Sequence, residues 1–300
     1  MSSIAYVTDR DMIEYHRING NTSMNFWRAG TTKKFTDFKK NDLLFFLAKG
    51  TERKREKGII GYGRFTHCHN LTIHDMWKKY KNLNGYSSEK ELSEAIHKMY
   101  DDVPEKMNCI YLEDVVFFGY PIYLSELNIT VSNKLETYIY LDKDERNVTS
   151  EILGIAKNIG IDLWSTHFST TDHNILERDE TKHLLAGAFN KINSDYYTKS
   201  EATRNYKIMN SFNSEHDFEF IKGSKSDSYK IVDNKIIIAI PFQMNTKDMM
   251  EKLQYCVGHI EVYKVLLKEL SQRYSIQYRL ISDSELSPLV SEVIEGLNHE

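Results

Sequence analysis

The chain has 300 residues, of which 41% are hydrophobic and 27% charged, and its formal net charge at pH 7 is −4. This length exceeds what one small hydrophobic core needs, so we expect one large or two ordinary domains. The charge excludes a polycation that coats DNA over its whole surface, so any nucleic-acid-binding surface must be a local patch. The three cysteines, Cys68, Cys109 and Cys256, are far apart and predict free thiols in a reducing compartment.

The sequence also argues against secretion and membrane insertion. Its first residues, MSSIAYVTDRDMIEYH, lack a basic segment followed by an apolar one, so no signal peptide is predicted. The longest apolar runs, such as residues 236–241, are strand-sized and too short to span a bilayer. We therefore expect a cytoplasmic protein without membrane contact.

The first half of the chain reads mainly as strands with a helical insert. A helix is expected over residues 9–18, followed by the β-rich runs DLLFFLAKG and GIIGYGRFTH. The charged segment TERKREK between these runs predicts a hairpin with a basic loop. Two helices are then expected in TIHDMWKKYKNLNG and SSEKELSEAIHKMY, each beginning at a capping threonine or serine. The run CIYLEDVVFF returns to strand, which Pro121 is expected to end.

A polar crossing at residues 133–150 marks the expected domain boundary, which gives domains 1–140 and 150–300. Three helical segments follow: TSEILGIAKNIGIDLW, ETKHLLAGAFNKI and SEATRNYKIMNSF. The strands DSYKIVD and KIIIAIPF are joined by the turn residues Asp233 and Asn234. A long helix over residues 246–273, the strand SIQYRLIS and a last helix complete an α+β fold, with an α/β domain in the second half.

Five motifs resemble, in order and spacing, the EVE-type PUA-like domain of modification-dependent restriction endonucleases. They are NFW at 25–27, NDLLFFLAK at 41–49, IIGYGRF at 59–65, a helix with Trp77 followed by NG at 84–85, and CIYLEDVVFF at 109–118. The match covers roughly residues 24–135. It implies a small, partly open β-barrel with a helical insert, which binds a flipped base such as 5-methyl- or 5-hydroxymethylcytosine.

The same resemblance implies roles for individual residues. Trp27 and Tyr62 would form the walls of the base pocket, because an extruded base must regain its stacking against aromatic faces. Asn25 would donate or accept a hydrogen bond at the pocket edge, and Arg64 would contact a phosphate or the base. The basic residues expected to follow the nucleic-acid backbone are Lys33, Lys34, Lys39, Lys40, Arg53, Lys54, Arg55 and Lys57. A core position for Trp27 and a strand bend at Tyr62 are the structural alternatives.

Over residues 200–297, the order of elements is similar to the PD-(D/E)xK restriction-nuclease core. That resemblance implies Asp227 as a catalytic residue and ligand of Mg²⁺, with Gln243 and Lys247 replacing the missing acid and lysine. The place of the E-x-K motif reads Ala239-Ile240-Pro241. Three alternatives stay open: an active nuclease with a rearranged site, a decayed nuclease-like fold kept for dimerisation, and an unrelated α/β domain.

The leading hypothesis is a Mg²⁺-dependent endonuclease that reads modified cytosine in double-stranded DNA by base flipping, in defence against DNA that carries this modification. The alternative is a non-catalytic protein that binds modified DNA, or RNA, and recruits or assembles partners. The apolar residues of the helix over 246–273 offer a seam for a homodimer, although core packing is the commoner role of such a stripe.

Overall fold

A computed structural model of the protein describes residues 3–29, 38–49, 56–132, 134–142, 147–162, 164, 174–192 and 196–299. Its contacts divide the chain into two compact units, Met1–Glu180 (unit 1) and Thr181–Glu300 (unit 2). The division comes later than the boundary expected at residues 140–150. The reason is that Ile152 and Leu153 of the helix α4 (Val148–Ile159) are fully buried in a core of unit 1 together with Phe45 and Tyr62.

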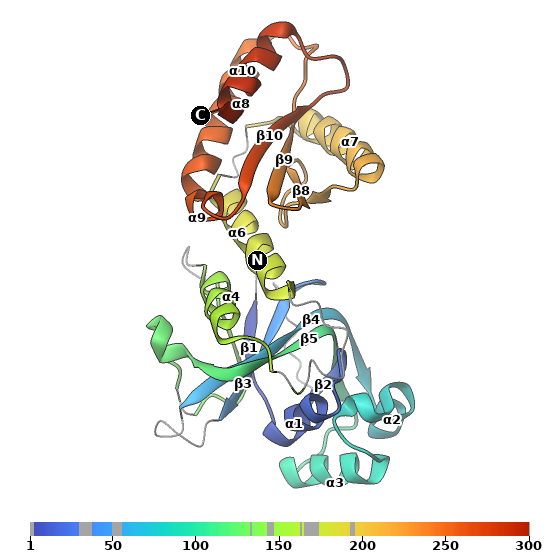
Figure 1. Ribbon diagram of the computed structural model, residues 1–300. Helices are drawn as coiled ribbons and strands as arrows, with labels where there is room; N and C mark the ends of the chain where they lie inside the picture. The colour runs from blue at the N-terminus through green and yellow to red at the C-terminus, as the bar shows by residue number, and fades with distance from the viewer. Residues whose placement is uncertain are drawn as a thin grey trace. The chain divides into compact units, whose positions relative to one another are not determined.

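Unit 1 is built on one six-stranded sheet in the order β2-β5-β4-β3-β1-β6 (Figure 1). The strands are β1 (Ile4–Val7), β2 (Met24–Ala29), β3 (Leu43–Lys49), β4 (Lys57–Leu71), β5 (Met107–Tyr123) and β6 (Tyr138–Tyr140). Only β1 and β3 pair in parallel, and the remaining neighbours are antiparallel. The ladder between β4 and β5 shifts register at three places, and such bulges bend and twist a sheet. An open, curled sheet results, and the predicted α+β class is confirmed.

Pro121 does not end β5, which continues to Tyr123. The prediction was wrong because a proline is tolerated where the ladder does not require its missing N–H. Ile122 and Phe117 are paired with Ile59 and Gly61 across a register shift, and Pro121 lies exposed within this irregular stretch.

The helices of unit 1 begin where the sequence predicts them. Besides α4, they are α1 (Arg10–Ile18), α2 (Ile73–Tyr80) and α3 (Glu89–Met99), with Asp9, Thr72 and Ser88 as the N-caps of α1, α2 and α3. The described residues of unit 1 also form two 3₁₀ turns, η2 (Lys81–Asn84) and η3 (Leu124–Leu127). Gly85 ends η2 with a φ of 86°, and a Cβ there would lie 2.5 Å from Cγ of Met12 in α1, so this position requires glycine.

The sheet of unit 1 carries a hydrophobic core on each face. Successive side chains of a strand point to opposite faces, so Phe45 and Phe46 belong to different cores. Phe46 packs with Trp27 and with α2 and α3, whereas Phe45 packs with Tyr62 and α4. This explains why residues 43–47 are apolar without alternation.

Unit 2 contains a four-stranded sheet in the order β10-β9-β8-β7. The strands are β7 (Glu219–Phe220), β8 (Ser228–Val232), β9 (Lys235–Pro241) and β10 (Ser275–Ile281), and only β9 and β10 are parallel. The helices are α7 (Lys199–His216), α8 (Met249–Leu266), α9 (Lys268–Ser271) and α10 (Pro288–His299), while α6 (Ile175–Ile192) carries residues of both units. Figure 1 shows α7 on one side of this sheet and α8 with α10 on the other.

The predicted order of elements in the second half is therefore confirmed, with two differences. The short strand β7 was not predicted, and the helix expected over residues 246–273 is divided into α8 and α9. Its apolar stripe is divided as well: Leu253 and Ile260 are buried in the core, whereas Val262 and Val265 are 44% and 74% exposed. A homodimer seam on this helix stays a prediction. Among the described residues, no helix combines the length and apolar character that crossing a membrane requires.

Candidate functional site

Asn25 and Trp27, which the sequence predicts at a base pocket, are buried in β2. The indole Nε1 of Trp27 donates a hydrogen bond to the carbonyl oxygen of Asn84 at 2.9 Å, and Nδ2 of Asn25 donates to Oδ1 of Asn84 at 2.8 Å. Trp27 is 4% exposed and Asn25 is fully buried. Both side chains thus attach β2 to the turn after α2, and neither lines the two cavities described below. Their role in base binding stays a prediction.

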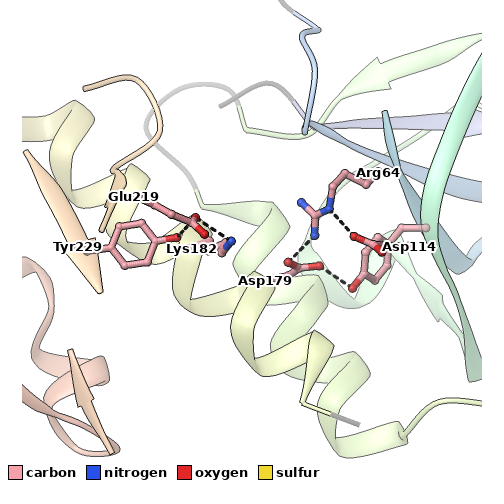
Figure 2. A network of polar contacts seen from close by, with 7 residues as sticks. Arg64, Asp114, Asp179, Lys182, Glu219 and Tyr229 are labelled. Atoms are coloured by element: carbon pink, nitrogen blue, oxygen red, sulfur yellow. Dashed lines mark hydrogen bonds and ion pairs between the residues drawn. The ribbon is translucent and has the colours of Figure 1, made fainter. Parts of the chain in front are cut away.

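Tyr62 and Arg64, the other two predicted pocket residues, meet the carboxylate of Asp179 from a distant part of the chain. Figure 2 shows Arg64 between Asp179 and Asp114. The Tyr62 hydroxyl donates to Oδ2 of Asp179 at 2.9 Å, and Nη2 of Arg64 donates to Oδ1 of Asp179 at 2.6 Å. Nε of Arg64 also donates to Asp114 at 3.0 Å. Burial, and next the negative charge of Asp179, raise the pKa of Tyr62 well above its usual value. Tyr62 is therefore a neutral hydrogen-bond donor inside unit 1, and Arg64 is paired with two carboxylates.

Asp179 was not predicted from the sequence as a site residue. It lies in the helical run NILERDETKH, a pattern in which an acidic residue is predicted to be an ordinary solvated charge. Its partners Tyr62 and Arg64 are more than a hundred residues away in the sequence, so no local sequence pattern predicts the contact. Figure 2 also shows a separate polar group of unit 2, in which Glu219 accepts hydrogen bonds from Lys182 at 3.0 Å and from Tyr229 at 3.1 Å.

The basic residues predicted to follow a nucleic-acid backbone lie mostly outside the described residues, namely Lys33, Lys34, Arg53, Lys54 and Arg55. Lys39 and Lys40 are exposed. Lys57 is different, because it is 4% exposed and its Nζ donates to the carbonyl oxygen of Ser132 at 3.3 Å. The prediction that Lys57 belongs to an exposed basic loop was wrong: the residue is already part of β4.

A cavity of about 470 Å³ lies in unit 1 beside α1 and the last residues of β5. Its walls include Phe117, Phe118 and Tyr123, which are largely buried, and Tyr120, which is 74% exposed. An aromatic ring this exposed at the edge of a cavity is free to contact a ligand. The short sequence GYP, in which Tyr120 follows a glycine and precedes a proline, was the available signal for this site.

Arg10 and Arg17 of α1 add positive charge to this cavity, and Glu14 and Asp162 add negative charge. Arg17 donates from Nε to Glu14 at 2.9 Å and from Nη1 to Asp162 at 3.2 Å. The hydrogen bond from Arg17 lowers the pKa of Glu14, which keeps this carboxylate ionised. Arg10 is exposed at the rim. The cavity therefore combines aromatic walls with an exposed arginine, Arg10, that can contact a phosphate.

In unit 2, the predicted catalytic residues Asp227 and Gln243 bond to different partners, and their catalytic role stays a prediction. Asp227 is 2% exposed and is surrounded by donors: Oδ1 accepts from Ser226 at 2.7 Å, and Oδ2 accepts from Nε2 of His259 at 2.7 Å and from the Tyr263 hydroxyl at 2.8 Å. Gln243 instead bonds to Asn205 at 2.7 Å. Lys247 is exposed in the segment before α8.

These residues do not fit a magnesium site of the nuclease type. A nuclease-type site needs carboxylates of more than one residue around the ion, whereas the side chains that bond to Asp227 are those of a serine, a histidine and a tyrosine. Within the described ranges, no group of three or more His, Cys, Asp or Glu side chains is placed to hold a metal ion. His259 and Tyr263 of α8, which both contact Asp227, are spaced four residues apart on the helix, but their common partner was not predicted.

No protein-family model matches this sequence, and no curated protein matches it. Among solved structures, the ASCH protein from Zymomonas mobilis is 13% identical, and the match covers 51% of this chain and 94% of that chain at a TM-score of 0.35. Two mutants of this protein match with 14% and 13% identity, cover 52% and 51% of this chain and 99% and 95% of theirs, and give TM-scores of 0.35 and 0.36. Similarity of this size does not establish a shared function. The EVE-type and restriction-nuclease resemblances stay predictions.

Proposed function

We propose that the protein binds nucleic acid through unit 1 and that one base enters the cavity beside α1. The observation that carries this proposal is the exposed ring of Tyr120 at a cavity of about 470 Å³ whose other walls include Phe118 and Tyr123. Stacking on such a ring is worth about 1–3 kcal/mol per base. The EVE-like motifs of residues 24–135 support the same function class.

Arg10 of α1 supports binding of the phosphate next to that base. It is exposed at the rim of the cavity, whereas the carboxylate of Glu14 is bonded to Arg17. Each phosphate contact of this kind makes affinity fall with rising salt concentration. Where an added methyl group on cytosine packs against the aromatic side chains of the cavity, it would raise affinity by roughly 1 kcal/mol. We therefore also propose a preference for cytosine modified at C5.

DNA cleavage would require a metal site in unit 2. The surroundings of Asp227 do not offer the oxygen ligands that a magnesium-dependent nuclease needs. We accordingly propose a protein that reads nucleic acid, and the leading sequence hypothesis of an endonuclease is tested in the same assay by adding Mg²⁺.

Replacing Tyr120 with alanine is expected to weaken binding by about 5- to 100-fold, because the stacking surface is lost. The measurement is fluorescence anisotropy with short labelled DNA and RNA strands that carry plain, 5-methyl- or 5-hydroxymethylcytosine. Arg10→Ala is expected to weaken binding to all strands alike and to reduce the salt slope by about 1. Gel analysis of the same mixtures with and without Mg²⁺ reports any cleavage.

The matched control is Tyr206→Ala, which removes an exposed tyrosine of unit 2 that does not line this cavity. Its affinity should equal that of the unmodified protein. Equal affinity of the Tyr120→Ala protein would remove the cavity from the proposal. If no strand binds at low salt, the proposed function itself fails.

A further inference from the structure

A second cavity, of about 360 Å³, lies wholly within unit 2. This volume falls within the roughly 300–1,000 Å³ that small-molecule pockets occupy. Its lining includes a ring pair, a lysine and three buried polar residues: Tyr197, Tyr255, Lys225, Asn205, Asp227 and His259. Nothing in the proposed function of unit 1 uses this cavity.

The orientation of the Asn205 amide is fixed by its neighbours. Nε2 of Gln243 lies 3.3 Å from the carbonyl oxygen of Glu201, which can only accept, so Gln243 must present its NH₂ group on this side. The same NH₂ group donates to Oδ1 of Asn205 at 2.7 Å. The NH₂ group of Asn205 therefore takes no part in its contact with Gln243. Asn205 is 1% exposed, and its Nδ2 has no hydrogen-bond partner among the residues that the structure describes.

His259 is oriented in the same way by Asp227. Its Nε2 lies 2.7 Å from the carboxylate, so Nε2 carries a proton that it donates to Asp227, and Nδ1 is the ring nitrogen that remains for another partner. His259 is 8% exposed, and its Nδ1 lacks a hydrogen-bond partner within the described part of the chain. Asp227 also accepts hydrogen bonds from Ser226 and Tyr263, so three donors stabilise its negative charge.

Asn205 and His259 both line this cavity, and each has a buried polar atom without a partner among the described residues, whereas native proteins satisfy nearly all such groups. A ligand that accepts from Asn205 and forms a hydrogen bond with Nδ1 of His259 would satisfy both. The exposed ammonium group of Lys225 favours an anionic acceptor, and the rings of Tyr197 and Tyr255, 5.7 Å apart and nearly perpendicular, favour a flat apolar part. We propose that this cavity binds a nucleotide, with its phosphate on Asn205 and Lys225 and its base against the tyrosines.

The ligand chemistry could come from a free mononucleotide or from the phosphorylated end of a nucleic-acid strand. In both cases, a phosphate and one base occupy the cavity. The proposal stands independently of base binding in unit 1, because no lining residue of one cavity belongs to the other. Variants in unit 2 therefore test it without disturbing the site proposed for unit 1.

The experiment is isothermal titration calorimetry of the full chain with CMP, AMP, inorganic phosphate and a 5′-phosphorylated dinucleotide. Asn205→Asp keeps an oxygen for Gln243 but replaces the free NH₂ group by a second oxygen, which repels phosphate. We expect a loss of affinity of about ten-fold or more. Lys225→Gln changes an exposed side chain, leaves the core intact and is expected to weaken nucleotide binding several-fold. If Asn205→Asp does not fold, Lys225→Gln alone tests the proposal.

The matched controls are Asn210→Asp on the exposed side of α7 and Lys235→Gln at the start of β9, and both should bind as the unmodified protein does. Tighter binding of the mononucleotides than of the dinucleotide identifies the free nucleotide, and the reverse identifies a strand end. The proposal is overturned if no nucleotide gives saturable heat, if inorganic phosphate binds as well as CMP and AMP, or if Lys225→Gln and a folded Asn205→Asp bind like the unmodified protein.

Discussion

Replacing Asp179 with alanine is expected to lower the free energy of unfolding of unit 1 by about 3–5 kcal/mol, because the change leaves the guanidinium group of Arg64 without its buried partner. Asp179 is 1% exposed and receives hydrogen bonds from Tyr62 and Arg64 at 2.9 and 2.6 Å. Arg64 would keep only Asp114, whose side chain is half exposed. The loss of the buried partner of a largely desolvated charge is one of the few single changes with so large an effect.

Urea unfolding followed by tryptophan fluorescence measures this effect in the correct unit. All three tryptophans, Trp27, Trp77 and Trp164, lie within Met1–Glu180, so their emission reports on unit 1 alone. Tyr62→Phe is the graded comparison: it removes one hydrogen bond and should cost about 1 kcal/mol.

The double variant Arg64→Leu with Asp179→Leu removes both charges and should be more stable than Asp179→Ala, since no buried charge is left unpaired. A loss below about 1 kcal/mol for Asp179→Ala would contradict the buried ion pair.

Acid is expected to destabilise unit 1 through one histidine. His16 is fully buried in α1, and burial lowers its pKa from 6.5 to about 3. The unfolded chain therefore binds a proton at this residue near pH 6.5, whereas the folded chain does not do so until about pH 3. His16 thus contributes stability that is fully present above pH 6.5 and is lost as the pH falls toward 3. The slope in this window is about 1.4 kcal/mol per pH unit.

The measurement compares unfolding free energies at pH 7, 6, 5 and 4 for the unmodified protein and for His16→Gln, which keeps a polar side chain but cannot take up a proton. The two curves should converge as the pH falls, because carboxylates act on both proteins but the histidine acts on only one. His97→Gln changes an exposed histidine of α3 and should leave the pH dependence unaltered. Parallel curves for His16→Gln and the unmodified protein would show that His16 does not resist protonation.

Local signals in the sequence were sufficient for most elements. Thr72 is followed by apolar residues three and four apart, and its side chain accepts from the N–H of Asp75, so the start of α2 depends only on neighbouring residues. The turn at Asp233 and Asn234 is likewise local, with Asp233 at a φ of 51°. Pro121 was misread because its effect depends on whether the adjacent strand needs its N–H, which is a tertiary property.

The candidate sites were harder to predict because their contacts are long-range. An aromatic motif such as NFW looks the same whether Trp27 contacts a ligand or donates to the carbonyl of Asn84 in a turn. The resemblance to base-reading domains drew attention to Trp27 and Tyr62, both of which are buried. Tyr120, the exposed ring, lies in a strand whose motif ended just before it. Burial could not be judged from spacing alone, because residues on both faces of the central strands are covered.

Because the three thiols are buried to different extents, cysteine labelling can follow the unfolding of each unit separately. Cys68 is exposed on β4, whereas Cys109 and Cys256 are buried, and burial raises their pKa values to about 11 and about 12. A maleimide should consequently modify the folded chain once, at Cys68. Later uptake at Cys109 in unit 1 or Cys256 in unit 2, resolved by peptide mass, then records when each unit exposes its interior.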